Sequence, residues 1–548
     1  MTEEFERHSE IRGGELIRYY GSAAEVTVPD DVSIIAAGAF RACRKLTNVT
    51  LGKRVTSIHD DAFTDCQRLR QITFPAGLRE IGERAFSKCV SLVSVSLPKT
   101  VFTVGNAAFL QCSALKNVIL PASLSNLGAF AFADCSALEE ILLPEGLDAI
   151  HRSTFFRCTG LRHIHIPDSV RTIGSNAFAL CEALTDINLP DGVTYIGKGA
   201  FCSCAGLRTF RVPEQVGFLG NELFAGCRRL EDVILPPGLT RIGNHTFSAC
   251  AALRDPELPE GLKDIGESAF FGCGNLRDIR LPDSVETVGA AAFAYCGGLE
   301  QLRLSAGMTA VARQTFQNCR ALTSLCLPDS VRSIGDGACA GCVSLSAVLL
   351  PPELQTIGNE AFAGTALEAI SLPAHLRTVG KRAYANCFRL STVILPPEGC
   401  TVERDAFAGS EGIELAVLPD RLLFARRKLE KWRITADATV LRHRDLQVAS
   451  LLAEYADPST DPERREKLRD EIRAEIRQMK KHRHAAAPTG RVVETAETAE
   501  TAEAAETAES AQETTETAQE ADRAPDAPVS PAEAEAPSGT DNPDGTNA

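Results

Sequence analysis

Apolar residues recur along most of this chain in a pattern that repeats every 23 residues. The unit that begins at Phe270 reads FFGCGNLRDIRLPDSVETVGAAA, and Phe293 starts the same pattern again. Counted from the aromatic residue, a unit carries Cys at +3, Leu at +6, Ile or Val at +9, Leu at +11, Pro at +12, a branched apolar residue at +15, Ile or Val at +18 and Gly at +19. A strict period of this length predicts a solenoid, in which each coil buries its apolar face only against its neighbours.

Each unit contains the signals for extended structure. Residues 278–280 alternate between polar and apolar, which predicts a short strand with the central isoleucine inside, and Pro282 should end it because proline has no N–H to donate. A second extended stretch should place Val285 and Val288 inside, and we expect Gly289 to take a positive φ in a tight turn. Adjacent coils should lie about 4.8 Å apart, so that about 17 coils form a rod on the order of 80 Å long with a continuous parallel sheet along one side.

The repeated string resembles a known family. Residues 161–181, LRHIHIPDSVRTIGSNAFALC, have the form L-x-x-I-x-L-P-x-x-V-x-x-I-G-x-x-A-F-x-x-C. This form is similar to the BspA-like leucine-rich repeats, and the similarity covers residues from about 16 to 419. The resemblance implies an α/β leucine-rich-repeat solenoid with a parallel sheet face and a protein-binding role. Members of this family are often bacterial surface or secreted proteins.

Four segments are predicted along the chain: an N-terminal segment 1–15, the solenoid 16–419, a helical C-terminal region 420–484 and a tail 485–548. Apolar residues at three- and four-residue spacing predict that region 420–484 begins with a helical cap, and Trp432 could pack it onto the last coil. A charged helix over 462–484 should either lie on this cap or mediate self-association or partner docking. The tail holds 15 Asp and Glu against 2 Arg, a net charge of −13, and should be disordered because it has too few apolar residues to form a core.

The cysteines follow the repeat. Of 19 cysteines, fifteen occupy the +3 position, so we expect a buried column of reduced thiols that bond to a backbone carbonyl of the next coil. Cys339 and Cys342 have the C-x-x-C spacing of thiol oxidoreductases, yet both occupy core positions of the repeat. A redox or metal enzyme would need those two thiols to be accessible. Cys202 and Cys204 have no second pair at zinc spacing.

No motif for catalysis, cofactor binding or nucleic-acid binding stands out from the repeat, and no apolar run predicts a signal peptide or a membrane span. His163 and His165 lie on one strand face, but a metal site would need a third ligand such as Glu140 or Asp186. The sequence therefore predicts a cytoplasmic, non-enzymatic scaffold for protein–protein interaction without metal or cofactor. The alternative is a bacterial cell-surface adhesin or host-interaction protein exported by an unrecognised route.

The candidate partner-binding residues lie at the outward positions +8 and +10 of the first strand. Equivalent residues of successive coils should stack into columns of mixed charge that include one exposed isoleucine. An internal lattice of salt bridges is the alternative interpretation of these columns. The predicted binding residues are His163, His165, Arg211, Asp232, Ile234, Asp255, Glu257, Asp278, Arg280 and Arg303.

Overall fold

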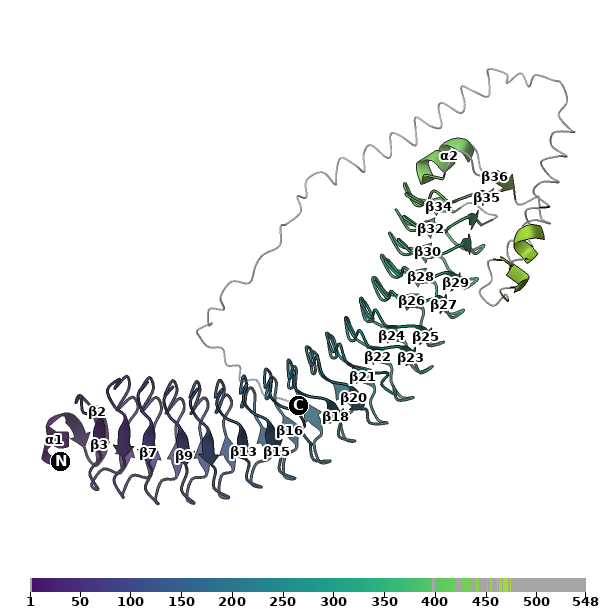
Figure 1. Cartoon of the computed structure of the whole chain (residues 1–548). Coiled ribbons are helices and arrows are strands. Elements are labelled where there is room, and N and C mark those ends of the chain that lie inside the picture. Colours follow the sequence, from purple (N-terminus) through teal and green to yellow (C-terminus); the bar gives the residue numbers. More distant parts are fainter. Residues whose placement is uncertain are drawn as a thin grey trace, which may run out of the picture. The chain divides into compact units, whose positions relative to one another are not determined.

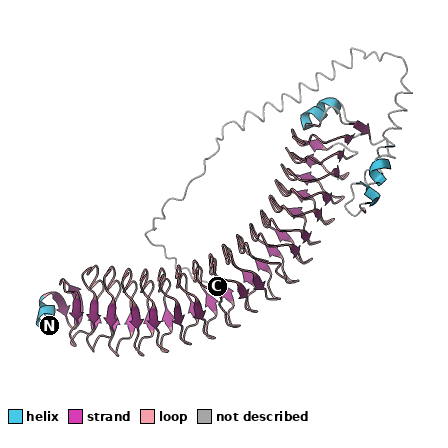
Figure 2. Cartoon of the chain, viewed as in Figure 1, coloured by secondary structure: helices cyan, strands magenta, loops and turns pink. Residues whose placement is uncertain are grey.

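The computed structural model describes residues 2–396, 400–418, 425–434 and 439–442, together with single residues and short runs between 451 and 474. It is a solenoid of about 17 coils, which Figure 1 shows stacked side by side in chain order. Strands occur throughout the stack and helices only near its ends (Figure 2). The predicted fold class is therefore confirmed. The predicted tail lies outside the described residues, as does most of the region 443–484.

Nearly every coil contributes two strands. The first, of three residues and in the last coil of four, centres on the inward +9 residue: β3 (Glu25–Thr27), β5 (Asn48–Thr50), β7 (Gln71–Thr73), β9 (Ser94–Ser96), β11 (Asn117–Ile119), β13 (Glu140–Leu142), β15 (His163–His165), β18 (Thr209–Arg211), β20 (Asp232–Ile234), β23 (Asp278–Arg280), β25 (Gln301–Arg303), β27 (Ser324–Cys326), β29 (Ala347–Leu349), β31 (Ala369–Ser371), β33 (Thr392–Ile394) and β35 (Leu415–Leu418). We call their exposed side chains the long-strand face.

The second strand of each coil has two residues and ends on the inward +18 position. These strands are β4 (Ile34–Ile35), β6 (Ser57–Ile58), β8 (Glu80–Ile81), β10 (Thr103–Val104), β12 (Asn126–Leu127), β14 (Ala149–Ile150), β16 (Thr172–Ile173), β17 (Tyr195–Ile196), β19 (Phe218–Leu219), β21 (Arg241–Ile242), β22 (Asp264–Ile265), β24 (Thr287–Val288), β26 (Ala310–Val311), β28 (Ser333–Ile334), β30 (Thr356–Ile357), β32 (Thr378–Val379) and β34 (Thr401–Val402). We call their exposed side chains the short-strand face.

The strands pair in parallel across coils, as in Asp278 with Gln301 and Asp264 with Thr287. The prediction of one continuous sheet is wrong, because both sets of strands are divided into several sheets. The long strands form sheets of only two to four strands. Within the described residues, 255–257 form no strand, since Pro256 occupies the +9 position and has no N–H for a ladder.

A third ladder runs through the turn around each aromatic residue. The N–H groups of Ser268, Phe270 and Gly272 donate to carbonyl oxygens of the next coil at 2.8–2.9 Å. Ser268 and Gly272 have positive φ angles of 52° and 72°, and most coils hold residues other than glycine at these two positions. A left-handed backbone costs about 1–2 kcal/mol per such residue. The hydrogen bonds to the next coil offset this cost.

The glycine at +19 has a different role from the predicted one. Gly289 does not take a positive φ. A Cβ atom on it would lie 2.5 Å from the backbone nitrogen of Glu267 and 2.6 Å from the carbonyl carbon of Gly266. At Gly289 the adjacent backbone therefore approaches too closely for a side chain, although four other coils hold a larger residue at this offset: His59, His151, Ala312 and Glu403.

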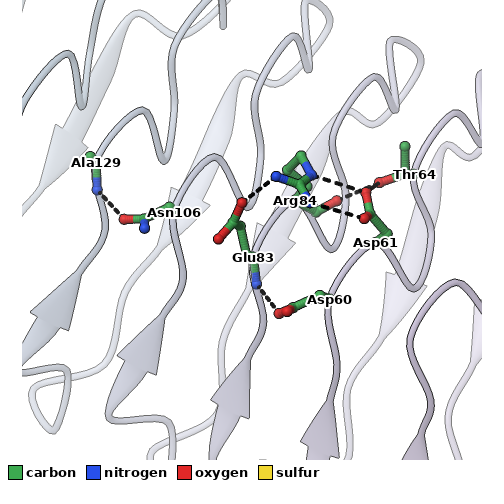
Figure 3. Close-up of polar contacts among 7 residues, drawn as sticks. All are labelled: Asp60, Asp61, Thr64, Glu83, Arg84, Asn106 and Ala129. Atoms are coloured by element: carbon green, nitrogen blue, oxygen red, sulfur yellow. Dashed lines mark hydrogen bonds and ion pairs between the residues drawn. The ribbon is translucent and has the colours of Figure 1, made fainter. Parts of the chain in front are cut away.

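Polar side chains also connect neighbouring coils, as Figure 3 shows for the N-terminal part of the stack. The carboxylate of Asp60 accepts a hydrogen bond from the backbone N–H of Glu83 at 2.7 Å, and the Asn106 side-chain oxygen accepts one from Ala129 at 2.9 Å. Arg84 donates to both carboxylate oxygens of Asp61 at 3.2 Å. These contacts lie at the surface and help to fix the register of one coil on the next.

Two columns fill the core. Phenylalanine rings stack from Phe40 to Phe316, with centroids 4.8–6.0 Å apart, and the stack resumes at Phe362 after an interruption at Cys339. Beside it, the Cys273 thiol donates to the carbonyl oxygen of Phe247 at 3.2 Å, and the other buried +3 cysteines repeat this bond. The acceptor belongs to the preceding coil, whereas the sequence analysis placed it in the next one.

The ends of the stack are closed by non-repeating structure. At the N-terminus, α1 (Thr2–Arg7) precedes β1 (Ser9–Arg12), which pairs antiparallel with β2 (Glu15–Tyr19). Phe5 is buried and stacks on Tyr19, which itself packs on Phe40, so the aromatic column continues into this cap. The structured cap thus includes residues before position 16.

At the C-terminal end, α2 (Ala425–Trp432) confirms part of the predicted helical cap. The buried Trp432 indole donates to the Val402 carbonyl oxygen at 2.9 Å, which attaches the helix to the last coils. Strand β36 (Thr439–Arg442) pairs with β35 and was not predicted. In the predicted helix over 462–484, the described residues 463–465, 467–471 and 474 are helical. Among the described residues, no helix has the length and hydrophobicity that a bilayer crossing requires.

Candidate functional site

The structure brings the predicted binding residues onto the long-strand face. The register pairs Arg211 with Ile234 and Arg280 with Arg303, so successive +10 residues are neighbours. Glu140 likewise pairs with His163. Nine of the ten predicted residues are exposed and Asp278 is half-buried. The face is an accessible surface of mixed charge, and Ile234, with 63% of its surface exposed, is its most prominent apolar side chain in this part of the stack.

A depression of about 620 Å³ lies on this face where Pro256 interrupts the strands. Five of the predicted residues contribute to its lining: Asp255, Glu257, Asp278, Arg280 and Arg303. Its other charged residues are Glu260 and Asp283, so five carboxylates surround two arginines. Arg280 lies 3.5 Å from Asp278 and Arg303 lies 3.2 Å from Asp283. Glu257 and Glu260 make no ion pair with the described residues, which leaves an excess of negative charge at the rim.

Asp255 has a structural role in this depression that the sequence analysis missed. Its Oδ1 atom accepts hydrogen bonds from the backbone N–H groups of Arg277 at 2.7 Å and Asp278 at 2.9 Å. In the following coil the equivalent two N–H groups, those of Glu300 and Gln301, both reach the Arg277 carbonyl oxygen. The Asp255 carboxylate thus replaces a backbone acceptor beside Pro256. The aspartate directly before a proline at +9 was the available sequence signal.

The predicted lattice of salt bridges along the columns is sparse. Arg211 pairs with Asp191 at 2.9 Å and Glu214 at 3.4 Å, which lie beyond the strand, and not with the +8 aspartates. Asp232 and Asp255 form no ion pair with the described residues. Both carboxylates therefore remain available as charges on the surface.

A second depression, of about 670 Å³, surrounds His163 and His165. His163 Nδ1 lies 3.6 Å from the Asp186 carboxylate, and Leu142 and Ile119 expose apolar surface beside the histidines. No group of three or more His, Cys, Asp or Glu residues in the described part of the chain is arranged to hold a metal ion. The chemistry of this depression is that of a mixed apolar and polar contact surface.

The thiols are placed for packing. Fifteen cysteines are buried, among them Cys339 and Cys342, and all 19 are free thiols. Burial raises the pKa of the Cys112 thiol to about 12, so the group stays protonated at neutral pH. A reactive cysteine needs an accessible thiolate. Cys339 and Cys342 are both buried, whereas a redox enzyme would need these two thiols to be accessible.

Thiol labelling can test this arrangement. In the native protein we expect a bulky maleimide to react rapidly with Cys326 alone. This cysteine is the last residue of β27 and is the exposed one of the 19. Three half-buried thiols, Cys43, Cys202 and Cys400, should react slowly, and the fifteen buried ones only in denaturant. Mass spectrometry counts the labels, and a Cys326→Ser variant should lack the rapid phase. Rapid labelling of many sites in the folded protein would contradict the buried column.

The short-strand face carries a pair of aromatic residues that was not predicted. Tyr195 and Phe218 both occupy the +17 position of successive coils and are both exposed. Their ring centroids lie 6.0 Å apart. Two aromatic residues at one outward offset in adjacent units were the sequence signal, and only the +8 and +10 offsets were considered.

The stacked coils, two exposed strand faces and buried columns define a solenoid repeat protein. A family model described as "BspA type Leucine rich repeat region (6 copies)" matches residues 18–135, 103–231, 218–324 and 309–428. The chain belongs to this BspA-type leucine-rich repeat family, as its sequence resemblance indicated. A search of curated proteins finds no match.

Two solved structures of similar proteins come from bacteria. A leucine-rich repeat protein from Bacteroides ovatus is 24% identical over 79% of this chain and 96% of its own, with a TM-score of 0.47. A leucine rich cell surface protein from Faecalibacterium prausnitzii is 24% identical over 69% of this chain and 89% of its own, with a TM-score of 0.37.

Proposed function

We propose that this protein is a non-enzymatic scaffold that binds a protein partner on the long-strand face between His163 and Arg303. The observation that carries the proposal is the depression beside Pro256, into which the fold gathers five of the predicted residues. A repeat fold offers a long surface of this kind without any catalytic group. The partner's complementary charges would select it, since charged surfaces give specificity and fast association.

The composition of the face indicates the strength of this contact. Ile234 supplies an exposed apolar side chain beside Arg211 and Asp232, but the proposed surface has no Trp or Tyr among its predicted residues. Aromatic anchors dominate tight interfaces. We therefore expect modest affinity that falls as salt screens the charges.

A pull-down with charge-reversed variants tests the proposed face. Glu257→Lys combined with Arg280→Glu keeps the net charge and avoids Asp255, whose carboxylate supports the backbone. The matched control is Lys99→Glu combined with Glu145→Lys, two exposed residues on loops without ion pairs in the described structure. Proteins captured by both the wild type and the control should be recovered about tenfold less with the face variant, a change of about 1.4 kcal/mol. Equal recovery with all three would place the contact elsewhere.

For the compartment, we propose the cytoplasm. The support is the set of fifteen buried free thiols, fourteen of them in the +3 column, a composition suited to a reducing environment. The alternative is an adhesin or host-interaction protein at the bacterial surface. It is supported by membership of the BspA-type family, whose members are often bacterial surface or secreted proteins. Protease treatment of intact cells separates the two, because only a surface protein is degraded while a cytoplasmic marker survives.

A further inference from the structure

The turn that follows each aromatic residue forms an edge of the stack, made of the exposed side chains at positions +1 to +7. In the coils of Phe40, Phe63 and Phe86 these turns are residues 41–47, 64–70 and 87–93, which we call the N-terminal turn edge. This edge holds six cations and one carboxylate, that of Asp65, a net charge of +5. All six cations are exposed, and they are Arg41, Arg44, Lys45, Arg68, Arg70 and Lys88.

The carboxylates around this edge leave most of its charge unpaired. Arg44 pairs with Asp65 at 3.0 Å, whereas the other five cations form no ion pair with the described residues. Asp61 and Glu83, which lie just before the aromatic residues of the second and third coils, are both paired with Arg84. The edge therefore presents five cations that neighbouring carboxylates do not neutralise.

The fold does not require these cations. Lys45 and Arg68 occupy the +5 position, where the next two coils hold Ser91 and Ala114. The charge is not balanced elsewhere in the same coils, because residues 40–108 contain eleven Lys and Arg against five Asp and Glu, a net charge of +6. Like charges in neighbouring coils repel one another, so an anionic partner would lower the free energy of this surface.

Hydrogen bonds between the coils bring these side chains together. The N–H of Arg70 donates to the Thr47 carbonyl oxygen at 2.7 Å, and the N–H of Val93 donates to the Arg70 carbonyl oxygen at 3.2 Å. The +7 residues of the three coils are thus neighbours, and the same stacking places the +5 cations of the first two coils side by side. In the third coil Val90 and Val93 expose 39% and 43% of their surfaces, so apolar surface adjoins the positive charge.

The chemistry of this edge fits an acidic peptide. Arginine and lysine form charge-assisted hydrogen bonds with carboxylates, and the two valines offer a contact for an aliphatic side chain. A nucleic acid would make no use of the valines, and the three turns contain no aromatic residue on which a base could stack. Two coil steps span about 10 Å, a distance that an extended segment of three or four residues covers.

We propose that the N-terminal turn edge is a docking site for a short acidic segment of a partner protein, with its carboxylates on Lys45, Arg68 and Arg70 and an aliphatic side chain on Val90 and Val93. This site is independent of the partner site proposed for the long-strand face, because it shares no residue with that face. Its affinity should fall as salt screens the charges.

Fluorescence anisotropy with a labelled peptide tests the site in the full chain. The probe is the octapeptide DEVDELDE, and the neutral octapeptide NQVNQLNQ is the control ligand. The wild type should bind the acidic probe saturably at low salt and the neutral one not at all. Lys45→Glu with Arg68→Glu should weaken binding of the acidic probe about tenfold, because two attractive contacts become repulsive. Val90→Ser with Val93→Ser should weaken it about threefold through lost apolar contact.

The matched control is Arg228→Glu with Arg229→Glu, which makes the same change of net charge. Both arginines are exposed on the turn edge of a distant coil and form no ion pair with the described residues. This control should change the affinity less than about twofold, and circular dichroism should be the same for all variants.

Three results would overturn the proposal: no saturable binding to the wild type, an equal loss of affinity in the control pair, or unchanged affinity after replacement of both valines. Tighter binding of a thymidine oligonucleotide than of the peptide, with the same loss on Lys45→Glu and Arg68→Glu, would assign the edge to nucleic acid and would also overturn it.

Discussion

Raising the pH above about 9 should unfold the stack of coils cooperatively, because its core holds fifteen buried thiols. Burial raises the pKa of Cys112, Cys181 and Cys296 to about 12, against an ordinary value of 9.0. The thiol pKa is thus higher in the folded chain than in the unfolded one. This contribution to stability is fully present below the unfolded pKa and is lost as the pH rises from about 9 toward 12.

The expected effect is large because the thiols act together. Between pH 9 and 10 each buried thiol shifts the balance toward the unfolded chain by about 1 kcal/mol. The pKa is raised for fourteen of the fifteen buried thiols, the exception being Cys342, whose pKa is lowered by hydrogen bonds with Cys319 and Cys339. Fourteen such groups amount to on the order of 14 kcal/mol, comparable to the whole stability of a typical domain. The stack should therefore unfold before about pH 10.5.

Circular dichroism and thiolate absorbance, recorded on the same samples, check this result. Both signals should change in one transition, since a buried thiol ionises only when its coil opens. Urea unfolding at neutral pH, where the thiols remain protonated, is the control for the unfolded signal. Thiolate absorbance that develops fully while the circular dichroism remains native would show that the cysteines are accessible or that the core tolerates their charge.

Replacing Phe270 by alanine should destabilise the solenoid by about 3–5 kcal/mol. The ring is fully buried and stacks on Phe247 and Phe293, each with its centroid 5.2 Å away. Its removal leaves a cavity in a coil whose backbone is hydrogen-bonded to both neighbours, through β22 and β24 on one side, β23 and β25 on the other, and the turn ladder on both. Little collapse can therefore fill the cavity. Each coil contacts only its neighbours, and the substitution should therefore also divide the unfolding of the array into two steps.

Urea unfolding followed by circular dichroism measures this loss. Phe388→Ala is the control, because that ring is 74% exposed and its removal should change stability by less than about 0.5 kcal/mol. A small effect at Phe270 would mean that the aromatic column is not the main source of coupling between coils. In that case the backbone ladders would be the better candidate.

The repeat made most of the core predictable. Seventeen-fold repetition of one pattern lets each apolar position be assigned by its recurrence, so the inward strand residues, the aromatic column and the thiol column followed from sequence alone. The predicted outward columns on the long-strand face are also present, because alternation along a strand fixes which side chains point away from the core. What the periodic pattern could not give was the binding role of any column, which depends on a partner.

The tertiary structure decided the features that depend on contacts between different coils. Gly289 is required by the approach of Glu267 from the preceding coil, a distance that φ preferences do not report. Asp255 supports two backbone N–H groups only because Pro256 interrupts the ladder there. Phe5 and β36 close the two ends through pairings that occur once and so have no recurrence to reveal them. The local sequence pattern determined the structure of a single coil. Contacts between one coil and the next determined the need for Gly289, the support of the broken ladder at Pro256 and the closure of the two ends of the stack.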